Sequence, residues 1–489
     1  MMSARRPLAH FCMVAILFAW ASSVCLSYSY QPSVSYHQCT KELHTGDATE
    51  LRVFAAERLR KLLPRLAGTD AGRNVAAALE IAEGHGDSDA WIGAVLRAVS
   101  SILSAYGPKP ENWELRHDAF YLLDCPLHVA GGKAWQHEVA KFYSGFLDRL
   151  LQQIRTAQPE DNLLVWKLYN MGFVVKSKNC CVGFDINPKF LTSAQQASLA
   201  SALDIQFISH AHGDHFTGGF IKLMLAKGKY VVMPTNALPK ITHENFIGMR
   251  DSRQLPTIFH PVLAYCYPGS QDDVACNVYV VVLDGYVVSH NGDNCDTALY
   301  SEIGQAHKID VLLCNCWAQM NGYIDAAKPR VFISGHENEL DHDYSSRASY
   351  QHTYEQIAAL DIAPPWKPED PEPIILNYGE GILWSHAGKV VSASAAKRQS
   401  ETDASLGKGE IELTGHITSL DTNARMLVMA VNQIRMPGSK PIKLVPPRSK
   451  VIRYSDLPQN AKAGASILVM GDNTGIGKPM TARIVQQMQ

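Results

Sequence analysis

Apolar residues in the first third of the chain recur at helical spacing. Two stripes stand out: Leu51, Phe54, Leu59, Leu62 and Leu66 in one, and Phe142, Phe146, Leu150 and Ile154 in the other. The second stripe repeats every four positions, which places its members on one helix face. We therefore expect residues 40–158 to form a small helical domain. Its role, as a scaffold or in controlling access, does not follow from the pattern.

From about residue 160 the pattern changes to short apolar runs separated by turn residues. The segment LLVWKLYNMGFVVKSKNCCVGFDINP alternates around Gly172 and predicts the opening strands of a sheet, and KYVVMP predicts another core strand. In VYVVVLDGYVVSH, two apolar runs flank Asp284-Gly285, and an Asp-Gly pair is a strong hairpin signal. Strand and turn signals continue to about residue 385, so we expect one α/β domain over 160–385.

The last hundred residues have a different pattern of apolar and polar positions. Residues 386–408 are rich in Ala, Ser, Gly and Lys and are expected to be a linker. Residues 409–489 then alternate like strands divided by turns, which predicts a small β-barrel, resembling the OB type. From Ser405 to Gln489 there are eleven Lys/Arg and five Asp/Glu. Such a basic barrel could bind an anionic polymer or a membrane surface, but only Tyr454 is available to stack on a base, so a solvated accessory domain is favoured.

The N-terminus predicts export. Arg5-Arg6 precede the apolar run FCMVAILFAWA, and Ala19-Trp20-Ala21 fits a small-x-small cleavage pattern. We expect residues 1–27 to be a signal peptide and the protein to be secreted or periplasmic. The run is short for a membrane-spanning helix, with an uncleaved anchor as the alternative, and no other stretch is long and apolar enough to span a bilayer.

The densest chemistry lies in SHAHGDH, directly after the apolar run LDIQFIS. It places His210, His212, Asp214 and His215 within six residues. Imidazole and carboxylate are the ligands that suit zinc and similar divalent ions. Packed together without a metal, these groups would include several buried and unpaired polar atoms. In an extended segment His210 and His212 would point the same way, while Asp214 and His215 could turn toward a second metal position.

The pattern HxHxDH at the end of a strand resembles the signature of the metallo-β-lactamase superfamily. Two later features extend the resemblance: Gly292-Asp293 follows the predicted hairpin, and His336 follows the strand PRVFIS. The resemblance covers about residues 160–385 and implies an αββα sandwich. It is greatest to the lactonase-like and phosphodiesterase-like hydrolases, whose strand often ends in a segment like His290-Asn-Gly-Asp293.

The resemblance also implies a ligand set. His210 and His212 would hold a first metal; Asp214, His215 and His336 would hold a second, with Asp293 as the bridge. The family usually supplies a third histidine for the first metal, and the segment YCYPGSQDDVACNVYVV contains none. Residues near the expected place, or further upstream, are Ser270, Asp272, Asp273, His243 and His260. One or two metals are therefore expected, zinc by default, with manganese or iron also suited to mixed His/Asp ligands.

These ligands predict hydrolysis. A divalent metal lowers the pKa of water toward neutrality and polarises an electrophile, and Asp214 could take the proton of the nucleophile or orient it. We expect an exported metal-dependent hydrolase acting on a lactone, phosphodiester or amide of a small-molecule substrate. The alternative is a non-catalytic member that uses an incomplete site for binding or structure. Glu337, Glu339, His342 and Arg347 either line the pocket mouth and select an anion or form a solvated loop.

Length and composition narrow the partners. The chain has 489 residues, of which 46% are hydrophobic and 19% charged, with a formal net charge of −2. This is an ordinary globular composition, long enough for two or three domains. It carries no overall electrostatic attraction to nucleic acid, so nucleic acid is not an expected partner. The oligomeric state is left open.

Overall fold

The computed structural model describes most of the chain from Leu43 onward. The described residues are 43–84, 90–235, 237–255, 262–271, 274–317, 319–360, 362, 367, 370–385, 391–392, 410–421, 424–435, 442–453, 463, 466–472 and 480–487. The expected signal peptide, residues 1–27, lies outside them. Within the described residues, no helix is long and apolar enough to cross a membrane.

The N-terminal region is helical, in agreement with its apolar spacing. Its helices are η1 (Leu43–Thr45), α2 (Ala48–Leu62), η2 (Leu63–Leu66), α3 (Asp70–Glu83), α4 (Ala90–Ala105), η3 (Pro110–Asn112), α5 (Trp113–Leu127) and α6 (Lys133–Thr156). The stripe from Phe142 to Ile154 is buried along α6, and in the first stripe only Phe54 is partly exposed. Side-chain caps start two of the helices: Asp47 accepts from Thr49 N and Glu50 N, and Thr69 accepts from Gly72 N.

Two mixed sheets follow. The first has the order β15-β14-β1-β2-β3-β4-β5-β6 and the second β13-β12-β11-β10-β9-β8-β7. The strands of the first sheet are β1 (Leu163–Lys167), β2 (Phe173–Lys176), β3 (Cys181–Phe184), β4 (Ile205–Phe207), β5 (Tyr230–Pro234), β6 (Phe246–Met249), β14 (Gly381–Trp384) and β15 (Val391–Ser392). Those of the second are β7 (Arg253–Leu255), β8 (Val262–Gln271), β9 (Val274–Leu283), β10 (Tyr286–His290), β11 (Val311–Asn315), β12 (Val331–Gly335) and β13 (Glu372–Ile374).

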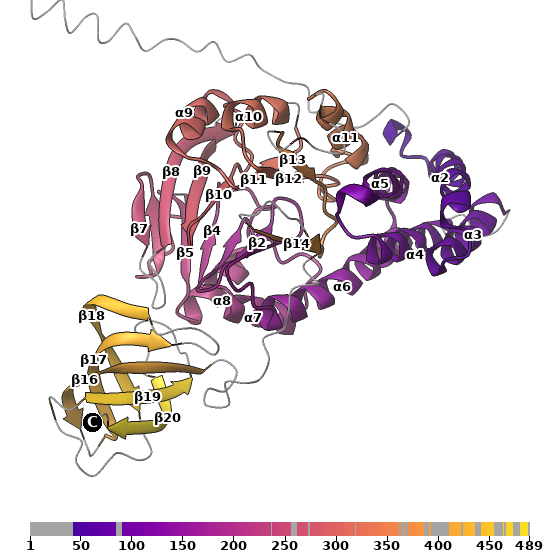
Figure 1. Cartoon of the computed structure of the whole chain (residues 1–489). Helices are drawn as coiled ribbons and strands as arrows, with labels where there is room; N and C mark the ends of the chain where they lie inside the picture. Colours follow the sequence, from indigo (N-terminus) through magenta and orange to yellow (C-terminus); the bar gives the residue numbers. More distant parts are fainter. Residues whose placement is uncertain are drawn as a thin grey trace, which may run out of the picture. The chain divides into compact units, whose positions relative to one another are not determined.

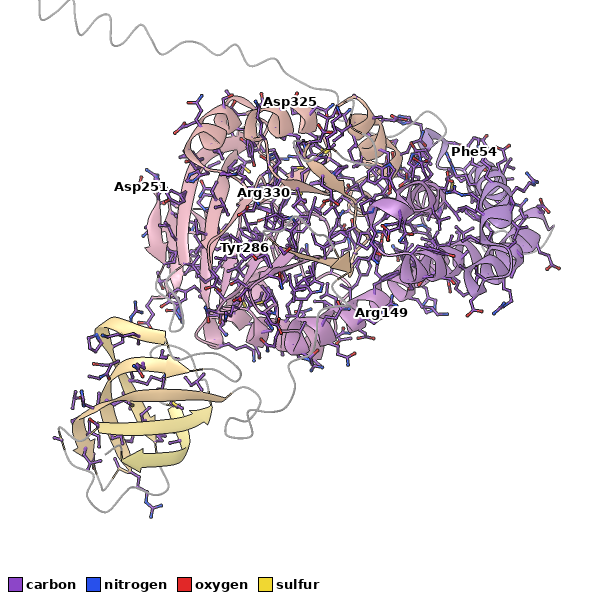
Figure 2. The ribbon with its side chains drawn as sticks, in the orientation of Figure 1. Phe54, Arg149, Asp251, Tyr286, Asp325 and Arg330 are labelled. Carbon is purple, nitrogen blue, oxygen red and sulfur yellow. The ribbon has the colours of Figure 1, made fainter. Side chains whose placement is uncertain are left out.

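The core lies between these sheets and is capped by helices on their outer faces. One cluster of buried residues contains side chains from both sheets, such as Phe184, Phe207 and Tyr279. The outer helices are α7 (Ser193–Ala202), α8 (Gly218–Ala226), α9 (Ala298–Ala306), α10 (Met320–Ala327), η4 (Tyr344–Ser346) and α11 (Tyr350–Ala358). Helices α7 and α8 cover one sheet and α9 and α10 the other, with side chains filling the layers between them (Figures 1 and 2). The arrangement is an α/β sandwich of four layers.

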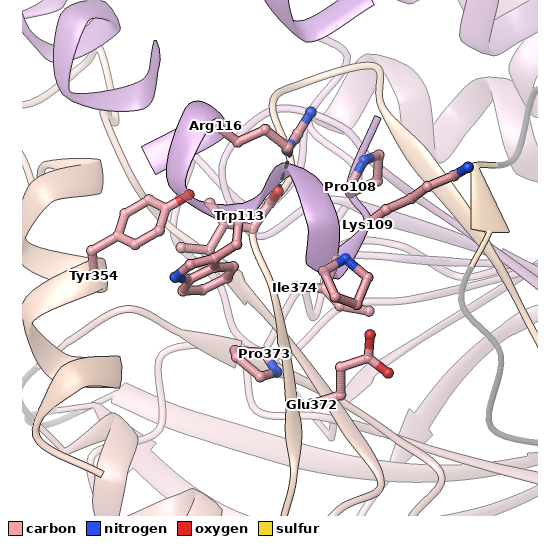
Figure 3. A pocket seen from close by; sticks show the side chains of 10 residues that line it. Pro108, Lys109, Trp113, Arg116, Tyr354, Glu372, Pro373 and Ile374 are labelled. Carbon is pink, nitrogen blue, oxygen red and sulfur yellow. Dashed lines mark hydrogen bonds between the residues drawn. The ribbon is translucent and has the colours of Figure 1, made fainter. Parts of the chain in front are cut away.

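The helical region packs against this sandwich and shares a continuous buried cluster with it. Arg116 on α5 is 3% exposed and binds Glu380 through both guanidinium nitrogens, at 3.0 and 2.7 Å. A small pocket opens at the same boundary (Figure 3). Trp113 and Tyr354 contribute aromatic rings to its wall, with ring centroids 4.9 Å apart. None of the predicted metal ligands lines this pocket.

The C-terminal strands form a closed five-stranded barrel, as the alternation predicted. They are β16 (Glu410–Asp421), β17 (Met426–Arg435), β18 (Ile442–Arg453), β19 (Ser466–Asp472) and β20 (Met480–Gln487). Their order is β16-β17-β18-β20-β19, and only β18 and β20 run parallel among the neighbouring pairs. The barrel has its own apolar core, which includes Ile411, Met429 and Val469.

The strand predictions made for the sandwich hold in detail. Asp284 and Gly285 both have positive φ, at 50° and 89°, and join β9 to β10 as a tight hairpin turn. Within the expected linker, Val391–Ser392 instead pair with β14 and extend the first sheet. The other residues of the range 386–408 lie outside the described part of the chain.

Candidate metal centre

The predicted ligands follow the carboxyl ends of three strands. The histidine-rich segment follows β4, Asp293 follows β10 and His336 follows β12. Strand β4 pairs in parallel within the first sheet, while β10 and β12 both pair in parallel with β11 in the second. Because neighbouring parallel strands end at the same edge of a sheet, these segments come together at one end of the sandwich. The structure thus joins residues that are more than a hundred positions apart in sequence.

Four side chains form the centre of the cluster: Asp214, His215, Asp293 and His336. Each offers one ligand atom, and these atoms all lie within 4.8 Å of one another. His215 Nε2 is 2.9 Å from Asp214 Oδ2 and 3.0 Å from Asp293 Oδ2. His336 Nε2 is 3.2 Å from Asp293 Oδ2. Asp214 has 17% of its side chain exposed and is the most open of the four, since the other three are at most 3% exposed.

This cluster leaves buried polar atoms without hydrogen-bond partners. His210 Nε2 and Asp293 Oδ1 are such atoms. Leaving buried polar atoms unpaired costs free energy, so native proteins usually satisfy them with a protein group, a water or an ion. Two carboxylates and two imidazoles whose ligand atoms lie within 4.8 Å of one another form the donor set of a divalent metal site. The residues present therefore fit a metal ion.

The electrostatics of the cluster also favour a cation. Burial would lower the pKa of His336, but the attraction of Asp293 outweighs burial and raises this pKa to about 10. Burial likewise opposes the charged form of His215, yet Asp293 and Asp214 raise its pKa well above the ordinary value. For Asp293, burial is outweighed by His215 and His336, which hold its pKa well below the usual range. The carboxylates thus attract positive charge to this point, and a divalent ion would supply it.

Asp185, which the sequence motifs did not indicate, organises two of the histidines. It follows β3 at φ 43° and is fully buried. Its Oδ2 accepts from Ser209 Oγ at 2.6 Å and lies 2.7 Å from His215 Nδ1, which donates to it. Because Nδ1 makes this bond, Nε2 is the ring nitrogen that faces Asp214 and Asp293 and would ligate a metal, the arrangement in which a carboxylate orients a ligating histidine. Asp185 can be grouped with His210 and His215 as a candidate metal set. Because its oxygens already accept three hydrogen bonds, we assign it a supporting role.

The tautomer of His210 follows from the same hydrogen bonds. Ser209 Oγ gives its single proton to Asp185, so it must accept a proton from His210 Nδ1, 2.9 Å away. His210 Nε2 then carries a lone pair and lies 3.8 Å from Asp293 Oδ2. Burial, reinforced by the nearby His215, lowers the pKa of His210 to about 3, so the ring stays neutral. His210 is therefore ready to ligate.

Gly292 is required by close packing beside the centre. Its φ is 53°, and a Cβ at this position would lie 2.3 Å from Ser209 Cβ and 2.4 Å from Ser209 Oγ. No larger residue fits without moving the serine that orients His210. The glycine of the Gly-Asp pair thus lets the two ligand-bearing segments approach each other.

The expected first metal position is built less completely. His212 is partly exposed and its ring lies 4.5 Å from that of His210, but it belongs to neither group of candidate ligands. Ser270 is exposed, with its backbone N–H bonded to Asn294, and His243 is exposed in the loop before β6. Asp272, Asp273 and His260 lie outside the described residues. Within the described part of the chain, no side chain completes a site with His210 and His212.

The residues after His336 are mostly buried rather than solvated. Glu337 is fully buried and binds Lys167, and Arg347 is 6% exposed and donates to backbone carbonyls of Leu127 and His342. Glu339 is 1% exposed and lies 2.8 Å from His342 Nδ1. The solvated-loop alternative is therefore wrong for these three residues. Arg347 is also committed to the boundary with the helical region instead of an open pocket.

Several solved structures are similar to part of this chain. Neither a protein-family model nor a curated protein matches the chain. Among solved structures, Igni18, a metallo hydrolase from Ignicoccus hospitalis, is similar to 46% of this chain and 99% of its own, with 19% identity and a TM-score of 0.37. The metallo-β-lactamase fold protein YhfI from Bacillus subtilis is similar over 46% of this chain and 99% of its own, with 13% identity and a TM-score of 0.34.

A third similar structure is a hydrolase of the metallo-β-lactamase superfamily from Thermotoga maritima, described as putative and Zn-dependent. It covers 44% of this chain and 97% of its own, with 14% identity and a TM-score of 0.28. In this chain, paired sheets covered by helices hold Asp214, Asp293 and His336 at their shared end. The three structures are similar to this chain in their fold.

Proposed function

We propose that this chain is an exported metal-dependent hydrolase acting on an ester-like bond of a small molecule, such as a lactone, phosphodiester or amide. The observation that carries the proposal is the convergence of Asp214, His215, Asp293 and His336, whose ligand atoms all lie within 4.8 Å of one another. A divalent ion held there would lower the pKa of water toward neutrality and polarise the electrophile. Zinc is the default for these ligands, and manganese or iron would also suit them.

Asp214 is the residue best placed to act on the attacking water. It is the most exposed member of the cluster, and Asn170 Nδ2 donates to its Oδ2 at 2.7 Å, which fixes the carboxylate. Burial would raise its pKa, but His215 and His336 outweigh burial and lower it well below the usual range. A carboxylate held so firmly in its ionised form is a poor proton acceptor and a good hydrogen-bond acceptor. We infer that Asp214 orients the water more than it deprotonates it.

The alternative is a binding or structural metal site without turnover. It is favoured by one observation: within the described residues, His210 and His212 have no third ligand. A single metal position would still support hydrolysis, because three protein ligands and one open position are enough for a catalytic metal site. The well-built centre therefore favours the hydrolase.

The remaining parts are proposed to be accessory. The barrel order β16-β17-β18-β20-β19 supports an OB-type barrel, in which strands follow a Greek-key path. We propose a solvated accessory role for it and no nucleic-acid partner. Export rests on the apolar run near the N-terminus and is tested by sequencing the N-terminus of the mature protein.

The test of the main proposal is a hydrolysis assay on purified protein. The substrates are p-nitrophenyl acetate, bis-p-nitrophenyl phosphate and γ-butyrolactone, assayed before chelation, after it, and after restoring zinc, manganese or iron. We expect chelation to abolish turnover, a metal to restore it, and Asp214→Asn to lower kcat about 100-fold, because the water loses the carboxylate that orients it. His243→Ala is the control, since His243 is exposed and outside the cluster. A protein that binds metal but hydrolyses none of the three favours the binding alternative, and turnover that survives chelation rejects the metal mechanism.

A further inference from the structure

The turn that carries His336 is buried along its whole length. His336, Glu337, Asn338 and Glu339 are 2%, 0%, 0% and 1% exposed, although all four are polar. His336 and Asn338 also have positive φ, at 74° and 52°. A non-glycine residue in this region costs about 1–2 kcal/mol, so surrounding contacts must hold the turn in place. The position of a metal ligand thus depends on what those contacts are.

One of these contacts comes from the helical region. Asn338 Nδ2 donates to Asp124 Oδ1 at 2.9 Å, in a buried hydrogen bond between residues 214 positions apart. Asp124 lies on α5 and is 1% exposed. Asn338 is also held by its backbone N–H, which donates to Ala348 O at 2.6 Å. Its side chain therefore links a helix outside the sandwich to the turn two residues after His336.

Asp124 is itself fixed by another element. Its Oδ1 accepts from Tyr350 N at 3.0 Å, and its Oδ2 accepts from Gln351 N at 2.9 Å. Both donors belong to the first turn of α11, where free backbone N–H groups favour a negative charge. A carboxylate with three donors on two elements cannot shift without breaking several bonds at once. It joins α5, α11 and the turn at a single point.

We propose that the helical region is a working part of the metal centre, in which Asp124 acts through Asn338 to position His336. Asp124 is a positioning residue, because it touches neither the metal ligands nor the substrate. The inference rests on the metal site of the proposed function and extends it to residues outside the sandwich. It gives the helical region a role that its apolar stripes alone do not specify.

The test measures cobalt binding, which reports on the site without requiring turnover. Metal-free protein is titrated with Co²⁺, and the visible absorption of the bound ion gives the Kd. Asn338→Gly removes the side chain without straining a positive φ, and Asp124→Asn removes the charge from the other end of the same bond. We expect each variant to weaken Co²⁺ binding about 10-fold, as for other outer partners of metal ligands. The double variant should bind Co²⁺ about as well as the single variant that binds it more weakly, because both changes act on the same hydrogen bond.

A matched control separates positioning from general loss of stability. Lys176 Nζ donates to Ile154 O and Ala157 O at 2.9 and 2.8 Å, and so ties the helical region to β2 away from the turn. Lys176→Met should lower the Tm yet leave the Co²⁺ Kd within twofold of the wild type. Circular dichroism checks folding, and if Asp124→Asn does not fold, Asn338→Gly decides the question alone.

The outcomes distinguish the inference from the proposal on which it depends. Wild-type protein that binds no Co²⁺ overturns the proposed metal site. Wild-type protein that binds Co²⁺, with Asn338→Gly binding it equally well, overturns the positioning role of Asp124. Equal weakening by Lys176→Met would also overturn it, since the effect would then follow stability and not the link.

Discussion

The buried ion pair behind His336 provides a quantitative prediction. Lys167 Nζ lies 2.5 Å from Glu337 Oε2, and both side chains are 0% exposed. Thr353 Oγ1 donates to the other oxygen of Glu337 at 3.1 Å. The ammonium also lies 5.5 Å from the ring centroid of Tyr350 and 5.6 Å from that of Tyr378. The carboxylate of Glu337 thus depends on two partners, the Lys167 ammonium and the Thr353 hydroxyl.

Lys167→Met keeps the length of the side chain and removes its charge. Glu337 would then be an uncompensated buried carboxylate, and breaking one side of such a pair costs about 3–5 kcal/mol. Unfolding entropy of about 2 cal/mol/K per residue, over the roughly 350 residues from Leu43 to Ser392, gives about 0.7 kcal/mol/K. A loss of about 4 kcal/mol therefore corresponds to a fall in Tm of about 5–6 °C. Adding Glu337→Gln removes the stranded charge and keeps an acceptor for Thr353, so most of the loss should be recovered.

The assay is thermal unfolding followed by circular dichroism for wild type, Lys167→Met, and Lys167→Met with Glu337→Gln. The control is Lys178→Met, which breaks a pair with Asp161 whose side chains are 40% and 90% exposed. Exposed pairs contribute about 0–1 kcal/mol, so this control should lower the Tm by about 1 °C or less. If Lys167→Met costs no more than Lys178→Met, or if the double variant is less stable than the single, the reasoning about the buried charge is wrong.

Three further predictions concern the centre and the domain boundary. Gly292→Ala should lower the metal content and reduce stability by about 2 kcal/mol or more, because the new methyl group meets Ser209. Gly285 is the control, with φ 89° and no atom within 4 Å of an added Cβ, so Gly285→Ala should cost only about 1 kcal/mol and keep the metal. Elemental analysis and thermal unfolding check both variants. Asp185→Asn should weaken Co²⁺ binding about 10–100-fold, since a ligating histidine loses its orienting carboxylate, and an unchanged Kd would refute that role. Arg116→Met should destabilise the protein by about 3–5 kcal/mol in urea unfolding by stranding Glu380, and a loss below about 1 kcal/mol would contradict a structural role for this pair.

The metal ligands were predictable because their signal is local. His210, His212, Asp214 and His215 stand within six residues, a density that few structural needs explain. Asp293 and His336 were found by the resemblance, which supplied the order of strands and ligands. Periodicity alone predicted the helical region, the hairpin at Asp284-Gly285 and the barrel strands, since each depends on neighbours within one element.

The supporting residues were not predictable because their partners are distant. Asp185, Asn170 and Asp124 are single polar residues in the sequence, and nothing local separates Asn170 and Asp124 from surface residues. Asp124 meets Asn338 only after α5 has packed on the sandwich, 214 positions away in sequence. The one local hint was Asp185, an aspartate that directly follows the apolar strand VGF. Arg347 was likewise a candidate for the pocket mouth from its place in the sequence, but in the structure it donates to backbone carbonyls.

Metal content per chain tests the central claim most directly. Mature protein, incubated with zinc, manganese or iron and then desalted, is measured by elemental analysis as wild type, Asp293→Ala and His243→Ala. Asp293 contacts both His215 and His336, so its loss should empty the centre, whereas the exposed His243 should not matter. We predict at least one equivalent in the wild type and in His243→Ala, and much less than one in Asp293→Ala. No bound metal in the wild type, or equal content in Asp293→Ala, would contradict the assignment of these residues as a metal centre.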